Sequence, residues 1–527
     1  MGLAHNGNPP LARTGSGYRR QQHVNLTQIN YGGRPGWALL ENLSQIKSGA
    51  DCVVRLLPRA SIPAAKPPMT THIEFNASLL QRYDVAGPRY TSYPTAAQFH
   101  EEFGEADFRA AASRSNQLDR PLSLYFHIPF CSSVCYFCAC NRIVTGDHSR
   151  AAPYLASLHR EIELQGDIFG HRPVRQLHWG GGTPTYISAE QMISLMQKTR
   201  AHFLLLNDDS GDYSIEIDPR SIGAGVVADL RALGFNRMSL GVQDFDPRVQ
   251  RAVNRVQSHE QTAAVMAAAR EQGFRSVNVD LIYGLPLQSV ASFSSTLDRV
   301  MDLQPDRLSI FNYAHLPHLF KVQRQIDASQ LPPPSVKLDI LQKTIERLTA
   351  AGYVYIGMDH FARAGDSLAR AQQQGLLHRN FQGYTSHGDC DLVGLGVTAI
   401  SMVDDCYSQN LKLLANYENT VESGHLPLSR GLRLDADDKI RRDAIMQLIC
   451  DRCLDMDIFS QQHHIVFSDY FADELQSLQV LVADGLVVVG DRYIDVLPAG
   501  ALLLRNICMI FDRFLPGREN QHFSRAI

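Results

Sequence analysis

Short apolar runs alternate with longer amphipathic stretches between Leu122 and about Ala362. The apolar runs predict strands, and the stretches with apolar residues at helical spacing predict helices. The predicted strands are Leu122–Ile128, Gln176–Trp179, Tyr213–Asp218, Arg237–Val242, Ser276–Tyr283 and Arg307–Tyr313, with Tyr353–Met358 as a candidate seventh. The predicted helices are Pro153–Phe169, Ala189–Phe203, Val226–Leu233, His259–Gln272, Ser292–Leu303 and Ser335–Ala351. Repeated strand–helix units favour a parallel sheet, so the predicted fold is α/β, with a partial or full (β/α) barrel over residues 122–365.

The chain before the barrel has a different pattern. Residues 1–68 carry eight Lys or Arg against two acidic residues and lack sustained periodicity, which predicts a disordered extension. We expect translation of the natural protein to begin near Met69. Residues 69–121 predict a short helix, Ala77–Tyr83, and then the segment Gly87–Pro94, which prolines bracket and keep from forming a long helix. We expect this segment to cross the surface near a cleft, with residues 69–121 covering that cleft.

The chain after the barrel predicts a connecting segment, residues 366–429, and a mostly helical C-terminal domain, residues 430–527. The pattern of apolar and polar residues in this domain predicts helices at Asp437–Leu454 and Ser468–Asp484, then a hairpin at Leu486–Val496. Two helices followed by a hairpin resemble a winged-helix unit. Because fold alone does not give DNA binding and the chain is not basic, we interpret this domain as a lid or packing domain.

Length and composition narrow the possible classes of protein. At 527 residues with 44% apolar residues, the chain can form two or three domains with full cores. A formal net charge of -4 argues against a nucleic-acid binder with a broadly basic surface. No stretch approaches the roughly 18 uninterrupted apolar residues of a membrane span. Clustered cysteines without a cleavable apolar leader fit a reducing cytoplasm better than a secreted disulfide scaffold.

Four of the ten cysteines fall within ten residues, directly after the first predicted strand. The spacing Cys131-x3-Cys135-x2-Cys138 brings three soft thiolates around one metal centre at a small cost in loop closure. A closed iron–sulfur cluster is usually held by four ligands, so a 4Fe-4S cluster held by three would keep one iron open. The alternatives are a zinc site with Cys140 or His127 as fourth ligand, a disulfide, or a reactive thiol. Zinc ligands usually come as two separated pairs, and no second pair follows at a suitable distance.

Glycine and polar residues follow or end several predicted strands, where barrel enzymes build their sites. The run Gly180-Gly-Gly-Thr-Pro184 follows the second strand but lacks the Gly-Lys-Ser/Thr of a phosphate loop. Such glycines let a ligand approach and bind backbone N–H groups. Each polar residue alone is more simply a cap or a core hydrogen bond, but together they predict a shared pocket. They are Glu216, Asp218, Gln243, Asp244 and Asp280.

Two further motifs are interpreted as structural. Gly394-Leu-Gly-Val-Thr-Ala399 matches a dinucleotide-binding fingerprint, but no strand–turn–helix unit or suitable acidic residue accompanies it. Cys450 and Cys453 have redox-motif spacing, yet they lie inside the predicted helix Asp437–Leu454 and are expected to be buried helix cysteines.

The cysteine spacing, with Phe137 just before the third cysteine, resembles the signature of the radical S-adenosylmethionine (radical SAM) superfamily. From roughly Thr70 to Ile527, the chain further resembles the oxygen-independent coproporphyrinogen III oxidases. This resemblance rests on the segments Gly87–Pro94, Tyr125–Cys140, His178–Pro184, Gly241–Phe245, Asp280–Pro286, Phe311–His315, Gly357–Ala362, His378–Tyr384 and Arg505–Phe511.

The resemblance implies oxidative decarboxylation in haem biosynthesis. In that family a cluster electron cleaves SAM to a 5'-deoxyadenosyl radical, which takes hydrogen from a propionate β-carbon of coproporphyrinogen III. Two propionates become vinyl groups, which gives protoporphyrinogen IX and CO2. The alternative is a haem chaperone on the same scaffold. Such relatives usually lack the fourth cysteine and the Arg505–Phe511 ending, and this chain has both.

The resemblance also implies a set of site residues. Cys131, Cys135 and Cys138 would bind the cluster, and Cys140 is a candidate for substrate-side radical or proton chemistry. Arg255 would pair with the methionine carboxylate of SAM, and Asp280 would accept from its ribose hydroxyls. The residues around the first SAM would be Tyr125, Phe137, Gly181, Gly182, Thr183, Glu216, Gln243, Arg255 and Asp280. Those matching a second SAM are Phe381, Gln382, Gly383 and Ile400.

The same resemblance implies the partners and setting of the protein. We expect a low-potential electron donor such as flavodoxin or ferredoxin, with coproporphyrinogen III as substrate. A cluster with one open iron is exposed to oxidants, so we expect anaerobic chemistry in the cytoplasm. No nucleic acid and no membrane span are expected, and the family implies a monomer.

Overall fold

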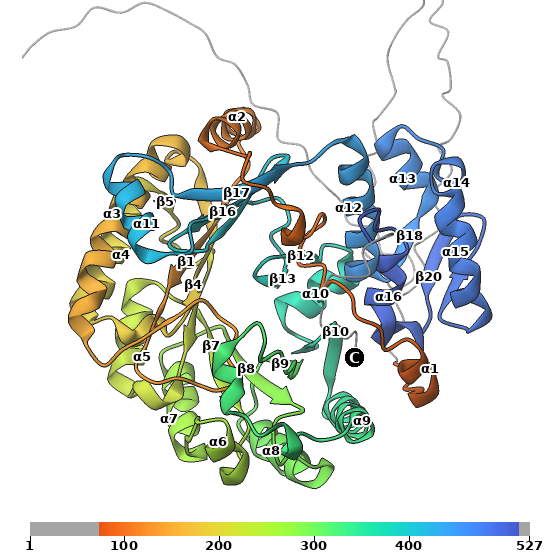
Figure 1. Ribbon diagram of the computed structural model, residues 1–527, viewed down its shortest axis with the longest axis horizontal. Coiled ribbons are helices and arrows are strands. Elements are labelled where there is room, and N and C mark those ends of the chain that lie inside the picture. Colours follow the sequence, from red (N-terminus) through yellow and green to blue (C-terminus); the bar gives the residue numbers. More distant parts are fainter. Residues whose placement is uncertain (1–72, 516–527) are drawn as a thin grey trace, which may run out of the picture. The chain divides into compact units, whose positions relative to one another are not determined.

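The computed structural model describes residues 73–515 (Figure 1). The predicted disordered extension, residues 1–68, and the predicted start at Met69 lie outside the described residues. Within the described part, thirteen strands form one sheet in the order β10-β11-β9-β8-β7-β6-β4-β1-β14-β15-β16-β17, with the short β5 (Leu204–Leu205) beside β4. The strands at the two ends of this order do not pair with each other, so the barrel is partial.

The middle of the sheet is parallel, and the six strands predicted there are confirmed in order. Its strands are β1 (Leu122–Ile128), β4 (Pro173–Gly181), β6 (Asp212–Ile217), β7 (Arg237–Gln243), β8 (Ser276–Tyr283), β9 (Arg307–Asn312) and β14 (Asp391–Leu395). The seventh parallel strand, β14, was not predicted. Its five residues are all buried beside β1, but Gly394 and the glycine after it hide the strand pattern.

Antiparallel strands extend the sheet on both sides. Beyond β9 lie β11 (His360–Arg363) and β10 (Tyr353–Gly357); beyond β14 lie β15 (Ile400–Val403), β16 (Cys406–Asn410) and β17 (Leu428–Arg433). The candidate seventh strand of the barrel therefore exists as β10 but does not continue the parallel series. It turns back at once through residues 358 and 359 into β11, and a turn this short can only join antiparallel neighbours.

Six of the crossover helices follow the predictions within about two residues, and the short α6 was not predicted. They are α3 (Ala151–Phe169), α4 (Ala189–His202), α5 (Ala224–Leu233), α6 (Pro247–Ala252), α7 (His259–Glu271), α8 (Val290–Asp302) and α9 (Pro334–Ala350). Figure 1 shows α3, α4, α5, α7 and α8 along the outside of the curved sheet. No helix within residues 73–515 combines the length and apolarity needed to cross a membrane.

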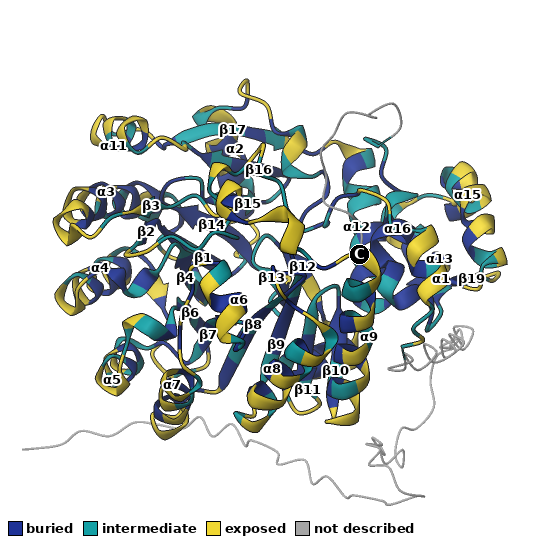
Figure 2. Cartoon of the chain, turned by 60° about the horizontal axis from the view of Figure 1, so that its bottom comes forward, coloured by how far each residue is buried: buried dark blue, intermediate teal, exposed yellow. Residues whose placement is uncertain are grey.

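Alternation along the parallel strands separates an apolar face from a polar one. Leu177, Ile215, Leu240 and Val279 are fully buried in one large apolar cluster. The intervening residues are polar and face the inside of the barrel, where pairing sets Ser239 opposite Asn278 on the neighbouring strand. Figure 2 shows the consequence: the strands are largely buried, and the outer faces of the helices are exposed. The apolar face holds the sheet to its helices, and the polar face is left for a cavity.

The connecting segment contains more structure than the sequence predicted. Besides β14 to β17, it holds α10 (Ser367–Gln374), a hairpin of β12 (His378–Asn380) and β13 (Gly383–Thr385), and α11 (Leu414–Glu422). Earlier in the chain, α1 (Ala77–Arg82), α2 (Glu105–Asn116) and the short strands β2 (Phe130–Cys131) and β3 (Ile143–Val144) complete the N-terminal part.

The C-terminal domain differs from prediction in two places. It contains α12 (Ala436–Asp451), β18 (Cys453–Asp455), α13 (Met456–His463), α14 (Phe467–Tyr470), α15 (Ala472–Ala483), β19 (Val487–Val489), β20 (Tyr493–Val496) and α16 (Leu504–Met509). The hairpin is confirmed, and β18 adds a third strand to it. The helix predicted over Ser468–Asp484 is instead the two helices α14 and α15. Cys453 is not in a helix, because Arg452 takes a left-handed conformation (φ 53°) that ends α12 and starts β18.

The segment Gly87–Pro94 is buried, so the expectation that it crosses the surface is wrong. The Arg505 guanidinium donates to the carbonyls of Gly87 and Pro88, and the Tyr90 hydroxyl donates to Asp512 over 2.9 Å. The C-terminal domain therefore holds this segment through buried polar contacts, which are costly to break in isolation. None of its residues lines the cavity described below.

The glycine motif at Gly394–Ala399 is a strand–turn–strand connection between β14 and β15, which agrees with rejecting a dinucleotide site. The turn is fixed by Glu161 of α3, which is fully buried. Its carboxyl accepts from Gly396 N over 2.7 Å, from Asn410 Nδ2 over 2.7 Å and from the Tyr417 hydroxyl over 2.6 Å. Burial outweighs these contacts and raises the pKa of Glu161 to about 7.

We predict that Glu161 makes stability depend on pH. Its pKa is higher in the folded chain than the ordinary 4.5, so its contribution is fully present below about pH 4.5 and is lost as the pH rises through about 7. The loss amounts to roughly 3 kcal/mol at 1.36 kcal/mol per pKa unit. Denaturant unfolding of Glu161→Gln between pH 5 and 8 should show a flatter pH dependence than the wild type. Glu163→Gln, at a half-buried position of the same helix, is the control; equal slopes for wild type and Glu161→Gln would contradict the prediction.

Candidate functional site

A cavity of about 470 Å³ lies inside the barrel, with the cysteines at one end and polar strand residues along its walls. The structure brings most predicted site residues to it. The predicted residues that line it are Cys131, Cys135, Phe137, Cys138, Cys140, Gly181, Gly182, Thr183, Glu216, Gln243, Arg255, Asp280 and Gln382. The predicted residues that do not line it are Tyr125, Phe381, Gly383 and Ile400. Of the strand-end acids, Asp218 lines it, but Asp244 is buried elsewhere against Gln288 and Thr296.

The cysteine loop, residues 131–140, is fixed by neighbours on its outer side. Tyr136 N donates to Val253 O over 3.0 Å, and the Asn254 side chain donates to Val134 O over 2.7 Å. Tyr136 and Phe137 also pack on a small apolar cluster that includes Val253 at the end of α6. A loop of four cysteines has few apolar side chains of its own, so its shape depends on these contacts.

Donors and cations surround the three spaced thiols. Arg255 Nη1 lies 3.3 Å from Cys135 Sγ and 3.2 Å from Asp218 Oδ2, and the Thr183 hydroxyl lies 3.7 Å from Cys131 Sγ. The hydrogen bond to Cys140 lowers the pKa of the Cys138 thiol, and nearby Arg142 adds to that effect. Nearby cations favour thiolates, the form that binds metal. The donor set therefore fits an iron–sulfur cluster held by Cys131, Cys135 and Cys138.

The other uses of these cysteines fit less well. Every cysteine within residues 73–515 is a free thiol, which leaves no disulfide there. Both ring nitrogens of His127 are hydrogen-bonded, Nδ1 to the Tyr125 hydroxyl over 3.0 Å and Nε2 to Asn141 O over 2.9 Å, so it is not free to bind zinc. Tetrahedral zinc needs thiolates about 3.8 Å apart. Among the described residues, only His387, Asp389 and Cys390 have three ligand atoms within 4.8 Å of one another, and they lie outside the loop.

The glycine run serves a different purpose from the one predicted. Gly182 N donates to Ile128 O over 2.9 Å, Thr183 N donates to Phe130 O over 2.7 Å, and Gly181 N donates to Glu216 over 3.1 Å. These N–H groups are therefore not open to a ligand, and that expectation is wrong. A Cβ on Gly182 would lie 2.6 Å from Phe130 O, so glycine is needed because β4 and the start of the cysteine loop lie so close together.

Two carboxyl groups on the cavity wall differ in charge state. Burial would raise the pKa of Glu216, but a hydrogen bond from His178 and its positive charge when protonated hold it below its ordinary value. Burial raises the pKa of Asp280 to about 6, although the Ser239 hydroxyl donates to it over 2.7 Å. Tyr125 stacks on the His178 ring behind this wall, with ring centroids 5.9 Å apart. The wall thus offers an ionised carboxylate and, below about pH 6, a protonated one.

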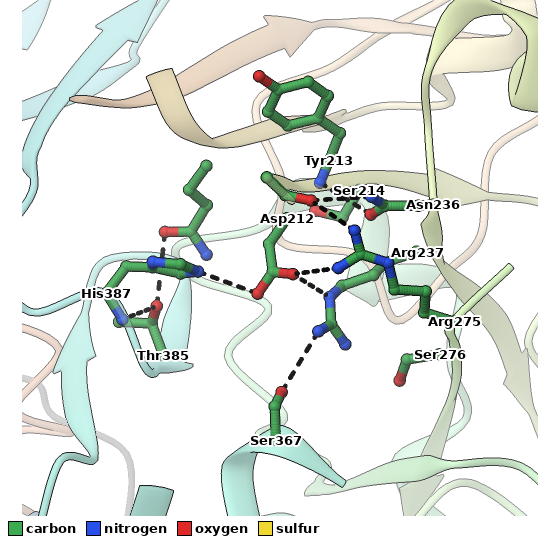
Figure 3. A network of polar contacts seen from close by, with 12 residues as sticks. Asp212, Tyr213, Ser214, Asn236, Arg237, Arg275, Ser276, Ser367, Thr385 and His387 are labelled. Carbon is green, nitrogen blue, oxygen red and sulfur yellow. Dashed lines mark hydrogen bonds and ion pairs between the residues drawn. The ribbon is translucent and has the colours of Figure 1, made fainter. Parts of the chain in front are cut away.

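The far end of the cavity is closed by charges that bind one another. Asp212, the first residue of β6, lies 3.0 Å from His387 Nε2 and 2.9 Å from Arg237 Nε (Figure 3). Figure 3 also places Arg275 on the Arg237 side and Ser367 below. Burial would raise the pKa of Asp212, but the hydrogen bond with His387 and the charge of Arg237 hold it well below its ordinary value. The charged groups at this end of the cavity are already paired with one another. The polar groups that remain available to a ligand therefore lie nearer the cysteines.

Sequence reasoning missed the polar residues in the interior of the strands. They line the cavity at every second position and include Gln176, His178, Asp212, Ser214, Arg237, Ser239, Ser276, Asn278, Arg307 and Ser309. The period-two alternation of polar and apolar residues in these strands is the signal that would have found them. It indicates a barrel with a polar interior.

Most of the residues predicted for a second SAM lie beside the cavity and do not line it. Gln382 lines the cavity, and its buried Nε2 has no hydrogen-bond partner in the described part of the chain. The buried His360 Nδ1, on the same lining, is likewise without one. Phe381 and Ile400 pack instead on an adjacent apolar cluster around Phe99. Unpaired buried polar groups are rare in proteins, so the two on the cavity lining indicate room for a polar ligand there.

Known proteins resemble this chain along most of its length. Residues 125–300 match the radical SAM superfamily. The chain is 53% identical over 460 residues to the oxygen-independent coproporphyrinogen III oxidase of Pseudomonas aeruginosa, across 87% of this chain and 100% of that protein. The enzyme of the same name from Synechocystis is 46% identical, across 86% of this chain and 98% of that protein. The solved structure of coproporphyrinogen III oxidase from Escherichia coli, described as a radical SAM enzyme, matches with a TM-score of 0.81 at 52% identity, covering 84% of this chain and 100% of that one.

We predict that Gly182→Ala prevents the cysteine loop from holding metal. The added methyl group would meet Phe130 O at 2.6 Å and Pro129 C at 2.7 Å, and both are backbone atoms. Overpacking of this kind costs about 1–3 kcal/mol and would displace the start of the loop. Iron content after anaerobic reconstitution should fall well below that of the wild type.

The matched control is Gly225→Ala in α5, where a Cβ meets nothing within 4 Å. Helix propensity makes this change neutral or slightly stabilising. Full iron content in Gly182→Ala, or equal iron loss in both variants, would contradict the prediction.

Proposed function

The chain belongs to the family of oxygen-independent coproporphyrinogen III oxidases, within the radical SAM superfamily, and on that premise we propose a role for each of its site residues. It is an oxidoreductase of haem biosynthesis that uses a 4Fe-4S cluster and SAM. It removes the carboxyl groups of two propionate side chains of coproporphyrinogen III, giving two vinyl groups and protoporphyrinogen IX. The observation that carries this conclusion is 53% identity across the whole length of a relative with that name.

Cys131, Cys135 and Cys138 would hold the cluster at the end of the cavity. When bound, the cluster supplies the electron that cleaves SAM to methionine and a 5'-deoxyadenosyl radical, which takes hydrogen from the propionate β-carbon. Arg255 contacts Cys135 and the Thr183 hydroxyl contacts Cys131, so both side chains would hydrogen-bond sulfur ligands of the bound cluster.

The first SAM would lie between the cysteine loop and the strand ends. Glu216 carries a carboxylate suited to the SAM amino group, and Arg255 carries the guanidinium suited to its carboxylate. Because Arg255 already contacts Asp218 over 3.2 Å, SAM would share or replace that contact. The carboxyl of Asp280 would accept from a ribose hydroxyl. The remaining residues proposed around the first SAM are Tyr125, Phe137, Gly181, Gly182, Thr183 and Gln243.

A second SAM remains part of the proposal, with Gln382 as its main polar contact. The unpaired Nε2 of Gln382 supports it, since a ligand carbonyl or carboxylate would satisfy that donor. Phe381, Gly383 and Ile400 would form the wall behind it. Cys140 lines the cavity and is exposed, so we retain it as the candidate for substrate-side radical or proton chemistry.

The partners and setting are also proposed. A low-potential donor such as flavodoxin or ferredoxin would reduce the cluster, and the protein would act as a monomer in a reducing cytoplasm. The named relatives give no support to the haem-chaperone alternative, because they are called oxidases. The substrate carries four carboxylates, and the polar lining of the barrel suits such a molecule better than an apolar lining would.

We predict that cluster-reconstituted protein decarboxylates coproporphyrinogen III under anaerobic conditions. With SAM and dithionite, porphyrin mass should report loss of two carboxyl groups while 5'-deoxyadenosine accumulates. Cys131→Ala should abolish both and lower the iron content, since it removes one of three ligands. Cys453→Ala, whose thiol lies outside the cavity, should keep its iron and its activity. Unchanged substrate despite a full cluster, especially with tight haem binding, would support the chaperone and overturn the proposed function.

A further inference from the structure

Two surface segments flank the outer side of the cysteine loop. One is α6, and the other is the 3-10 turn η5 (Lys321–Gln325). Val249 of α6 and Val253, directly after it, pack in one apolar cluster with Ile326, directly after η5, and with Tyr136 and Phe137 of the loop. The two segments therefore form one packed unit with the loop on the side away from the cavity.

Both segments also make direct polar contacts with the loop. Gln323 of η5 donates to Phe137 O over 3.1 Å, and Tyr136 N donates to Val253 O, the carbonyl just after α6. Three residues after the end of α6, Arg255 reaches Cys135. A path of a few covalent bonds and one hydrogen bond therefore joins this surface to the thiol of Cys135, a proposed cluster ligand.

These segments carry exposed positive charge, which we call the basic face: Arg248 and Arg251 on α6, and Lys321 and Arg324 on η5. Arg248 pairs with Asp246 over 2.8 Å. The other three contact no carboxylate within residues 73–515. A chain with a net charge of -4 thus presents a local positive surface at its cysteine loop.

A groove and exposed apolar side chains lie beside the basic face. A groove of about 470 Å³ runs between α6 and α8, lined by Phe245, Arg251 and Arg299 among others. Val256, four residues after α6, is 61% exposed, and Leu287, three residues before α8, is 40% exposed. Asp246, paired with Arg248, also lines this groove. Figure 2 draws exposed residues along α6.

We propose that the basic face docks an acidic one-electron carrier protein that reduces the cluster. This inference rests on the proposed function, which needs one electron for each SAM cleaved. The cavity side of the loop is committed to SAM and substrate, so a protein donor has to approach from the outer side. The carrier's reduced redox group loses one electron and the cluster gains it, and no bond forms or breaks in that step.

The chemistry of the face favours a transient acidic partner over a permanent one. Exposed charges steer association and raise its rate by 10-fold or more, and the effect weakens with salt because the Debye length is about 8 Å at physiological ionic strength. Small electron-transfer interfaces of this kind release the partner after each transfer. A few exposed apolar residues beside the charges supply the contact area that such an interface needs.

The test compares charge-reversal variants with purified flavodoxin as the acidic carrier. Arg251→Glu combined with Lys321→Glu should weaken binding of flavodoxin to the metal-free protein about 10-fold in a low-salt titration. The same double variant should slow cluster reduction by reduced flavodoxin to a similar extent, followed by absorbance in a stopped-flow instrument. Its turnover driven by dithionite should equal that of the wild type, because dithionite needs no docking surface.

Arg370→Glu combined with Lys412→Glu is the matched control, since both residues are exposed and contact no carboxylate in the described residues. This control should bind flavodoxin like the wild type, and wild-type binding should weaken as salt is raised. Equal flavodoxin affinity of the wild type and the Arg251/Lys321 variant, or an affinity that does not change with salt concentration, would overturn the docking proposal. Absence of dithionite-driven turnover in the wild type would instead overturn the proposed function. The binding titration would still test the docking surface.

Discussion

A buried cation beside a thiol is the contact on which the site depends. Arg255 lies between Cys135 and Asp218, and its guanidinium cannot lose its proton in a protein. Its positive charge lies beside the Cys135 sulfur, and Asp218 at the end of β6 balances that charge. Because Arg255 lies three residues after α6, one side chain ties the cysteine loop to both the sheet and the outer helix. Removing one partner of such a pair typically costs about 3–5 kcal/mol, since the other charge is left buried alone.

The polar interior of the barrel is the second constraint. Closed (β/α) barrels usually fill their interior with branched apolar side chains. Here the inward positions carry Ser, Asn, Asp and Arg, and the charges around Asp212 pair with one another. The cost of burying them is met locally by hydrogen bonds, so the sheet relies on its outer apolar face for stability. This arrangement leaves a cavity open toward the cysteines, where the reactive chemistry is needed.

Much of this arrangement could be predicted from the sequence, for identifiable reasons. The apolar run of β1 and the alternating pattern of β8 matched their observed bounds, and the tight cysteine spacing marked the candidate metal site. The missing parts depend on tertiary contacts. Two glycines hid β14, the direction of β10 is set by a two-residue turn, and the burial of Gly87–Pro94 depends on Arg505, more than 400 residues away. The N–H groups of Gly181 to Thr183 looked open in sequence because nothing local reveals that β4 uses them to hold the loop.

The central claim is that three thiols hold one cluster whose fourth iron faces SAM in the barrel. Electron paramagnetic resonance of the reduced, reconstituted protein, recorded with and without SAM, tests it most directly. The account predicts about four iron and four sulfide per chain and a spectrum that changes when SAM is added, because SAM binds the open iron. A spectrum that SAM leaves unchanged, or a single metal ion per chain, would contradict it.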